Sequence, residues 1–76
     1  MGYLNLDKLK QGERGVIYSV GGEISERLYA LGIRSGRSVR FYIKSPLGDP
    51  CAYDFDGCII ALRKRDSEKI LINLEE

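Results

Sequence analysis

The predicted fold depends first on the stretch CAYDFDGCIIAL, which runs from Cys51 to Leu62. Asp56-Gly57 stands at its centre, and Asp-Gly readily adopts the positive φ angles of a type I′ two-residue turn. The flanking residues then form two antiparallel strands whose side chains alternate between faces. Three cross-strand pairs are expected on the core face: Phe55 with Cys58, Tyr53 with Ile60, and Cys51 with Leu62. The stretch is therefore predicted to be a β-hairpin.

Three more strands are expected, over residues 14–20, 37–44 and 70–74. Residues 37–44 have the clearest pattern, because Phe41 and Ile43 alternate with polar residues and are predicted to face the core. Residues 14–20 have apolar side chains on both faces. This strand is therefore either covered on both sides or bent at a β-bulge.

One helix is predicted between these strands, over about residues 25–31. Ser25 is placed to cap its N-terminus with the side-chain hydroxyl. Leu28 and Leu31 lie on one helical face that is predicted to pack on the core. Gly32 follows at the position where a left-handed residue often ends a helix. Together these elements predict a mainly β protein: a small SH3-like five-stranded β-barrel with one short inserted α-helix.

Length and composition limit what such a chain can do. It has 76 residues, a net charge of +1, two cysteines and no histidine. Without histidine there is no imidazole base or imidazole metal ligand, so a binding module is expected rather than an enzyme. The longest apolar run, from Cys58 to Leu62, is far shorter than the ~20 residues that span a bilayer. We therefore expect a single cytoplasmic domain over residues 1–76, with no direct membrane insertion.

Several stretches resemble a known family in their order and spacing. ISERLYALGIRSG covers residues 24–36 and holds a helix that ends in Leu-Gly-Ile, with a further glycine four residues later. SPLGDP at residues 45–50 is followed by IALRKRD at residues 60–66, and LDKLKQG opens the chain at residues 6–12. From about Tyr3 to Leu74, the chain resembles the FeoA family.

The resemblance implies an SH3-like β-barrel with an inserted helix. It also implies a non-enzymatic accessory role in bacterial ferrous iron uptake. The implied partner is the cytoplasmic region of the FeoB-type ferrous iron transporter, including its G domain, whose assembly or activity the protein would modulate. Nucleic acid is not expected as a partner, no cofactor is expected, and weak self-association is left open. The family has no agreed catalytic residues to carry over.

The cysteines and carboxylates do not predict a metal site. In the hairpin register, Cys51 and Cys58 lie ~13 Å apart along the strands at ~3.4 Å per residue. One metal ion cannot bind both sulfurs at that distance, and a disulfide requires Cα atoms closer than ~7 Å. Asp49 and Asp56 are more simply explained as turn residues.

The predicted partner-binding residues are basic, aromatic and loop residues. Residues 1–44 carry a net charge of +4, and residues 45–76 carry −3. Arg40, Tyr42 and Lys44 are expected to share the outer face of one strand, and Leu47 is expected at the tip of a loop. The full set is Arg27, Leu28, Tyr29, Arg40, Tyr42, Lys44, Leu47 and Asp49. The alternative is an ordinary solvated strand face and a singly exposed leucine.

Two other functions stay open on the sequence alone. One is a domain that senses or carries Fe²⁺, with oxygen ligands such as Asp49. The other is a nucleic-acid-binding SH3-like module that uses Arg40 and Lys44, for which a net charge of +1 is weak support.

Overall fold

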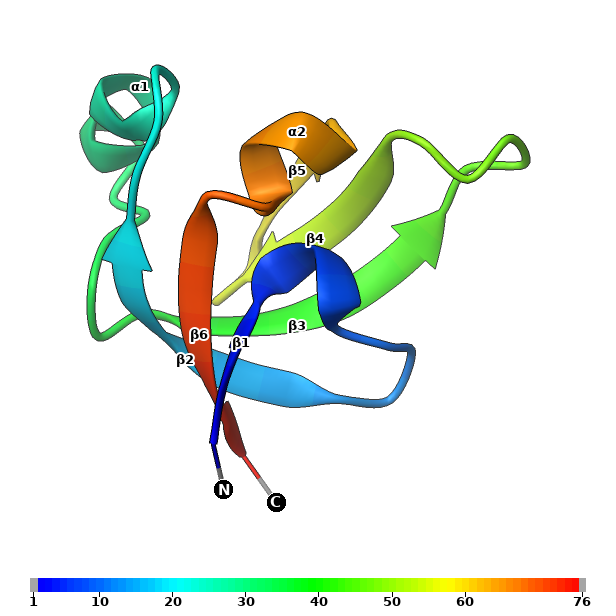
Figure 1. Ribbon diagram of the computed structural model, residues 1–76, viewed down its shortest axis with the longest axis horizontal. Coiled ribbons are helices and arrows are strands. Elements are labelled where there is room, and N and C mark those ends of the chain that lie inside the picture. The colour runs from blue at the N-terminus through cyan, green and yellow to red at the C-terminus, as the bar shows by residue number, and fades with distance from the viewer. Residues whose placement is uncertain (1, 76) are drawn as a thin grey trace.

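A six-stranded antiparallel sheet forms most of the computed structural model, which describes residues 2–75 (Figure 1). The strands are β1 (Tyr3–Asn5), β2 (Arg14–Val20), β3 (Ser38–Lys44), β4 (Cys51–Phe55), β5 (Cys58–Leu62) and β6 (Ile70–Glu75). Their order across the sheet is β1-β6-β2-β3-β4-β5. Within the same residues, three short helical segments connect the strands: the 3₁₀ helix η1 (Leu6–Lys8), α1 (Ser25–Ala30) and α2 (Lys64–Ser67). No helix in this part of the chain has both the length and the apolar character that a membrane crossing requires.

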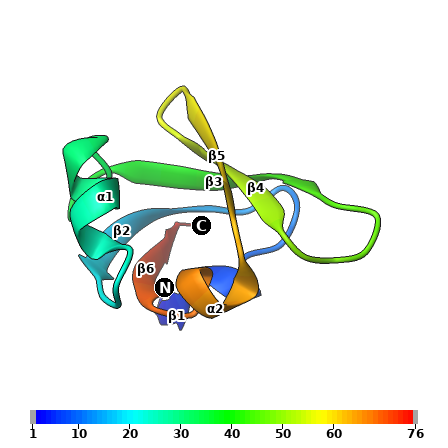
Figure 2. The ribbon, with the colours of Figure 1, turned by 90° about the horizontal axis from the view of Figure 1, so that it is seen from above.

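The sheet is strongly curved, so that β1 and β6 lie across the core from β3 and β4 (Figure 2). The enclosed side chains come from strands, helices and loops alike. Fully buried members of the core are Leu6, Ile17, Leu28, Ile33, Val39, Phe55, Ile70 and Ile72. Burial of such side chains supplies most of the favourable free energy of folding in a small domain. The mainly β prediction is confirmed.

The predicted count of five strands is wrong, because the start of the chain forms a sixth. β1 pairs with β6, where Tyr3 lies opposite Asn73 and Leu4 opposite Ile72. This pairing brings the two ends of the described chain side by side (Figure 1). A three-residue strand is too short to show alternation, and its partner lies at the far end of the chain. Local sequence therefore could not reveal it.

The predicted hairpin is confirmed in its register and in its turn. Phe55 lies opposite Cys58, Tyr53 opposite Ile60, and Cys51 opposite Leu62. Asp56 and Gly57 have φ angles of 58° and 99°, as a type I′ turn requires. Cys51 and Cys58 are both free thiols at opposite ends of the hairpin.

The predicted helix is confirmed at its C-terminus and corrected at its start. Gly32 has a φ of 85°, and the N–H groups of Gly32 and Ile33 donate to the carbonyls of Tyr29 and Leu28. This pair of hydrogen bonds is a Schellman motif. At the other end Ile24, not Ser25, is the N-cap, because its carbonyl accepts the first helical bond from Leu28. The Ser25 side chain makes no capping hydrogen bond.

Leu31 is predicted to pack on the core, but the structure leaves it exposed. The helix ends at Ala30, and the Leu31 side chain is 51% exposed, whereas Leu28 is fully buried. The left-handed turn at Gly32 redirects the chain so that Ile33 is buried instead. Ile33, which follows Gly32, is the residue whose apolar side chain completes a Schellman motif. It therefore occupies the core in place of Leu31, which helical spacing predicts to be buried.

Two β-bulges change which side chains face the core. In β2 the pairing with β6 shifts between Ile17 and Ser19, so the bulge alternative for this strand is confirmed. In β3 the pairing with β4 shifts between Phe41 and Ile43, which leaves Tyr42 as the extra residue. A bulge reverses the alternation of side chains beyond it. Ile43 is consequently 58% exposed, although simple alternation predicts it to be buried.

Candidate functional site

The structure contains a groove of about 660 Å³. One side is formed by η1 and the loop that follows it, and the other side by the region where β3, β4 and α2 meet. We call it the lysine-rimmed groove. Its apolar lining consists of Leu9, Phe41, Ile43, Cys51, Tyr53 and Leu62. Its lysines are Lys8, Lys10, Lys44 and Lys64, and two carboxylates, Asp7 and Asp49, complete its charged lining.

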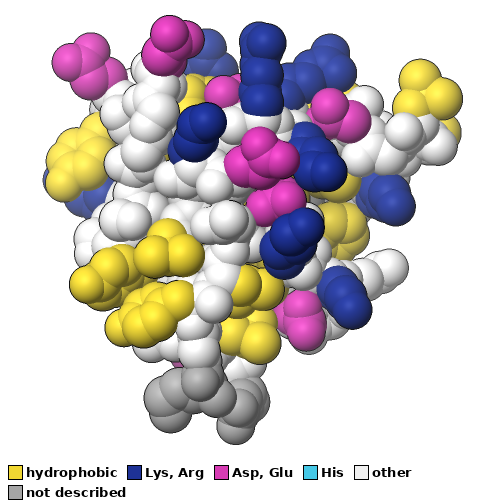
Figure 3. Space-filling model, viewed as in Figure 1, with side chains coloured by type: hydrophobic (Ala, Val, Ile, Leu, Met, Phe, Trp, Pro, Cys, Tyr) yellow, Lys and Arg dark blue, Asp and Glu magenta, His cyan; other side chains and the backbone are white. Residues whose placement is uncertain are grey.

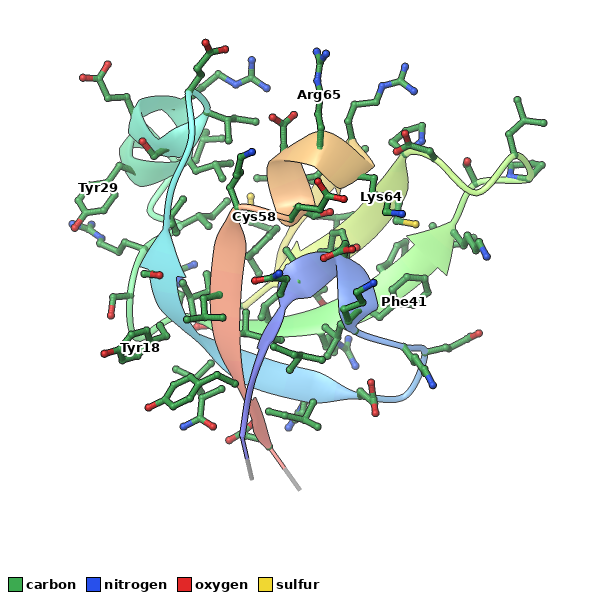
Figure 4. The ribbon with its side chains drawn as sticks, in the orientation of Figure 1. Tyr18, Tyr29, Phe41, Cys58, Lys64 and Arg65 are labelled. Atoms are coloured by element: carbon green, nitrogen blue, oxygen red, sulfur yellow. The ribbon has the colours of Figure 1, made fainter. Side chains whose placement is uncertain are left out.

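The floor of the groove is made by aromatic residues on adjacent strands. Phe41 on β3 lies opposite Tyr53 on β4, and their rings meet edge to face with centroids 5.8 Å apart. Such edge-to-face contacts add to the stability gained from burial. Tyr53 and Leu62 are buried beneath, whereas Phe41 is half-buried and offers part of its ring to the groove. Figure 4 shows Phe41 on the same side of the molecule as Lys64.

The bulge at Tyr42 places Lys44 on the rim of this groove. Beyond the bulge, Lys44 pairs with Cys51, whose side chain also lines the groove. Arg40, before the bulge, pairs instead with Asp54. The prediction that Arg40, Tyr42 and Lys44 share one strand face is therefore wrong, because the extra residue reverses the alternation between them.

The loop between β3 and β4 forms one wall of the groove and is fixed by several hydrogen bonds. The Lys64 N–H donates to Oδ1 of Asp49 at 2.9 Å, which ties the loop to the first residue of α2. Gly48 N–H donates to the Ser45 carbonyl, and the Cys51 thiol donates to the Gly48 carbonyl. Asp49 therefore serves as a structural anchor of this wall.

Two ionisable side chains, Tyr53 and Asp7, are buried below the rim. Burial, reinforced by the neighbouring Cys51 and acidic side chains, raises the pKa of Tyr53 to about 12, while a hydrogen bond with Ser67 opposes the rise. The phenol is thus neutral at physiological pH and can act as a hydrogen-bond donor. The Asp7 side chain is only 5% exposed, and one of its oxygens lies 3.9 Å from the Lys8 ammonium. Within residues 2–75, no three Cys, Asp or Glu side chains gather into a metal-binding group.

The structure brings only part of the predicted partner-binding set to the groove. Lys44 and Asp49 line it, and Leu47, which is 94% exposed, stands at the tip of the adjoining loop. Leu28 is fully buried in the core, so it positions α1 from inside and offers no surface to a partner. Tyr42 is exposed on the bulge.

Arg40 is held by an ion pair on another face. Its guanidinium lies 3.0 Å from the Asp54 carboxylate, and its Nε donates to the same oxygen at 3.1 Å. The Gly57 N–H donates to the other oxygen of Asp54 at 2.7 Å. That hydrogen bond first, and Arg40 second, lower the pKa of Asp54 below its ordinary value. Arg40 therefore braces the hairpin turn.

The remaining predicted residues form a second exposed surface on α1. Tyr29 is 56% exposed, and the Arg34 guanidinium lies 5.5 Å from its ring centroid, within cation–π distance. Arg27 is exposed on the same short helix, beside the exposed Leu31. Tyr29 lies on the opposite side of the molecule from Phe41 and Lys64 (Figure 4). The predicted residues therefore do not form one surface: Lys44, Leu47 and Asp49 lie at the groove, whereas Arg27 and Tyr29 lie on α1.

Several groove residues were missed by reasoning from the sequence. Lys8 and Lys10 stand in residues 6–12, where the sequence indicates only a family resemblance, and strand alternation predicts that Phe41 and Tyr53 face the core. A useful signal was present in the spacing Asp7-Lys8-Leu9-Lys10, where charged residues flank an apolar one. Which strand this segment would face depends on the pairing of β1 with β6.

The sequence matches the FeoA domain family model over residues 4–74. No curated protein matches it significantly. A manganese-dependent transcriptional repressor shares the fold alone, with a TM-score of 0.85 and 12% identity over 99% of this chain and 42% of that one.

Two solved FeoA structures are similar in both fold and sequence. FeoA from Chlorobium tepidum is 30% identical, with a TM-score of 0.82 over 95% of this chain and 69% of that one. FeoA from Stenotrophomonas maltophilia, solved with zinc, is 26% identical, with a TM-score of 0.83 over 95% of each chain. That protein is described as a prokaryotic SH3 domain protein and a candidate activating factor of bacterial ferrous iron transport. The SH3-like fold predicted for this chain is thereby confirmed.

Proposed function

Because the chain belongs to the FeoA family, we propose that it is a non-enzymatic accessory protein of bacterial ferrous iron uptake. It acts in the cytoplasm by binding the cytoplasmic region of the FeoB-type transporter, which includes the G domain, and it modulates the assembly or activity of that transporter. The observation that carries this proposal is the family match, which extends over residues 4–74.

The distribution of exposed side chains supports a binding role. Leu47 projects from a loop that hydrogen bonds hold in place, and the lysine-rimmed groove lies beside it. Tyr29 on α1 and Leu31 just after it are exposed large apolar side chains. Tyrosine and other large side chains set among polar neighbours are typical of the residues that carry most of the binding energy in protein interfaces.

Co-purification with the isolated cytoplasmic part of the cognate transporter tests this function. We expect a stable complex whose affinity falls about 10-fold or more in Leu47→Asp or Tyr29→Asp, because a carboxylate would replace an apolar contact at the interface. Tyr3→Asp is the matched control, since Tyr3 is as exposed as Tyr29, at 59% and 56%, but lies on β1. Melting curves establish that each variant is folded.

Two results would count against the proposal. One is the absence of binding by the unmodified protein with GDP, with a GTP analogue and with Fe²⁺ present. The other is an equal loss of affinity in Tyr3→Asp and Tyr29→Asp, which would show that the substitutions act through the fold.

A further inference from the structure

We infer that the lysine-rimmed groove binds an acidic peptide segment of the partner protein, with an apolar side chain against Phe41 and carboxylates beside the lysines. This inference rests on the proposed function and specifies the chemistry of the partner's contact. It concerns a site apart from α1, which carries the exposed Tyr29.

The charge on the groove is concentrated where a ligand would approach. Four lysines and two carboxylates line it, which leaves two positive charges in this small area, while the whole chain carries only +1. Both carboxylates keep their negative charge, but the lysines outnumber them four to two. Asp49 already accepts the Lys64 N–H, and the Asp7 side chain is 95% buried, since 5% is exposed. An approaching ligand therefore meets mainly ammonium groups, which attract and orient an acidic partner.

The interior of the groove offers a place for an apolar side chain. Phe41 and Cys51 are half-buried and Ile43 is exposed, and all three line the groove. Figure 3 shows hydrophobic surface on the right of the molecule with both basic and acidic side chains around it. An apolar centre with a charged rim is the usual anatomy of a protein interface.

The shape of the groove favours a peptide over an anionic membrane. Lysines around apolar residues could also bind acidic lipids, but a bilayer is flat on the scale of this molecule, whose longest dimension is 28 Å. The apolar floor lies below the rim, where Tyr53 and Leu62 are buried. A peptide side chain can enter such a cavity, and its volume of about 660 Å³ lies in the range that holds ligands in proteins.

The experiment uses overlapping synthetic peptides that cover the cytoplasmic part of the cognate transporter, together with that intact part. Fluorescence anisotropy measures affinity, and amide chemical shifts of the labelled protein locate the contact. The test variant is Lys10→Glu/Lys44→Glu, which reverses one charge on each side of the groove. Its matched control is Arg65→Glu/Lys69→Glu, which makes the same change in net charge, and Arg65 points away from the groove (Figure 4).

We expect the strongest peptides to be acidic and to contain a large apolar residue. Their affinity should fall about 10-fold or more in Lys10→Glu/Lys44→Glu and change little in the control variant. Their binding should also shift the amide signals of Phe41 and Cys51. The milder Lys10→Gln/Lys44→Gln variant should lose a smaller part of the affinity, which separates a charge effect from damage to the fold.

Several outcomes would overturn the inference and leave the proposed function intact. Binding of the intact transporter part that depends on Tyr29 but not on Lys10 and Lys44 would place the contact elsewhere. Selection of neutral or basic peptides would contradict the charge argument. Groove-dependent binding to phosphatidylglycerol vesicles without peptide binding would identify a membrane instead. If the intact transporter part does not bind at all, the proposed function itself fails.

Discussion

The β4–β5 hairpin and the lysine-rimmed groove lie next to each other, but they are specified in different ways. The hairpin register follows from one continuous stretch centred on Asp56-Gly57, and the structure has the predicted pairs. The groove uses three hairpin residues, Cys51, Tyr53 and Leu62, but the rest of its lining comes from η1 and the loop after it, β3, the loop before β4, and α2. Its composition depends on the bulge in β3 and on the pairing of β1 with β6, and no local sequence pattern indicates either feature.

This difference separates positions that hold the fold from positions that are available for binding. Hairpin side chains such as Phe55 are buried completely, whereas groove residues such as Ile43 and Lys44 keep much of their surface exposed. Substitutions in the hairpin should therefore act mainly on stability. Substitutions in the groove should act mainly on binding.

The largest expected effect is the loss of the hairpin's core contact in Phe55→Ala. Phe55 is fully buried and lies near Tyr53, with ring centroids 6.3 Å apart. Removing a buried phenylalanine costs about 3–5 kcal/mol of unfolding free energy, from lost burial and the cavity that remains. Urea denaturation measures it. A loss below about 1 kcal/mol would show that the hairpin does not anchor the core.

A smaller effect on stability is expected from Asp49→Ala in the groove wall. The substitution removes the acceptor of the Lys64 N–H in an exposed position, so we expect a loss of about 0.5–1.5 kcal/mol. The loop that carries Leu47 should become mobile, which amide hydrogen exchange of Gly48 and Lys64 would detect. Asp49→Asn retains an acceptor oxygen and serves as the control. If both variants exchange alike, the hydrogen bond does not hold the wall.

The smallest effect is a pH-dependent one at the base of the hairpin turn, in Asp54→Asn. The folded-state pKa of Asp54 is lowered from 3.8, first by the Gly57 N–H and then by Arg40. Because the folded pKa is depressed, the wild-type stability from this carboxylate is present above pH 3.8 and is lost as pH falls through the folded pKa. The variant keeps an acceptor for Gly57 but loses the charge that faces Arg40.

Melting temperatures across this pH range test the prediction. Asp54→Asn should melt below the wild type at neutral pH, and the two curves should converge as pH falls well below 3.8. A difference in melting temperature that stays constant down to acid pH would show that the substitution acts through the shape of the side chain and not through its charge.

Much of the fold was predictable because its signals are local. The turn at Asp56-Gly57, the left-handed end of α1 at Gly32 and the alternation in β4 and β5 each depend on neighbouring residues. The candidate site was predicted only in part. Lys44, Leu47 and Asp49 lie at the groove, but Arg40 is engaged by Asp54 and Leu28 is buried. Periodicity assumes a regular strand, and the regular alternation of residues 37–44 gives no sign of the bulge in β3 that reverses the faces.

The sequence by itself determined the mainly β character, the hairpin register, the helix terminus and the family. Turn chemistry, backbone sterics and apolar periodicity act over a few residues, so the order of amino acids is enough to reveal them. Only the tertiary structure decided that β1 closes onto β6, that Tyr42 bulges and that lysines from separate segments surround Phe41. Those features depend on contacts between distant parts of the chain, whose geometry is set when the whole core packs.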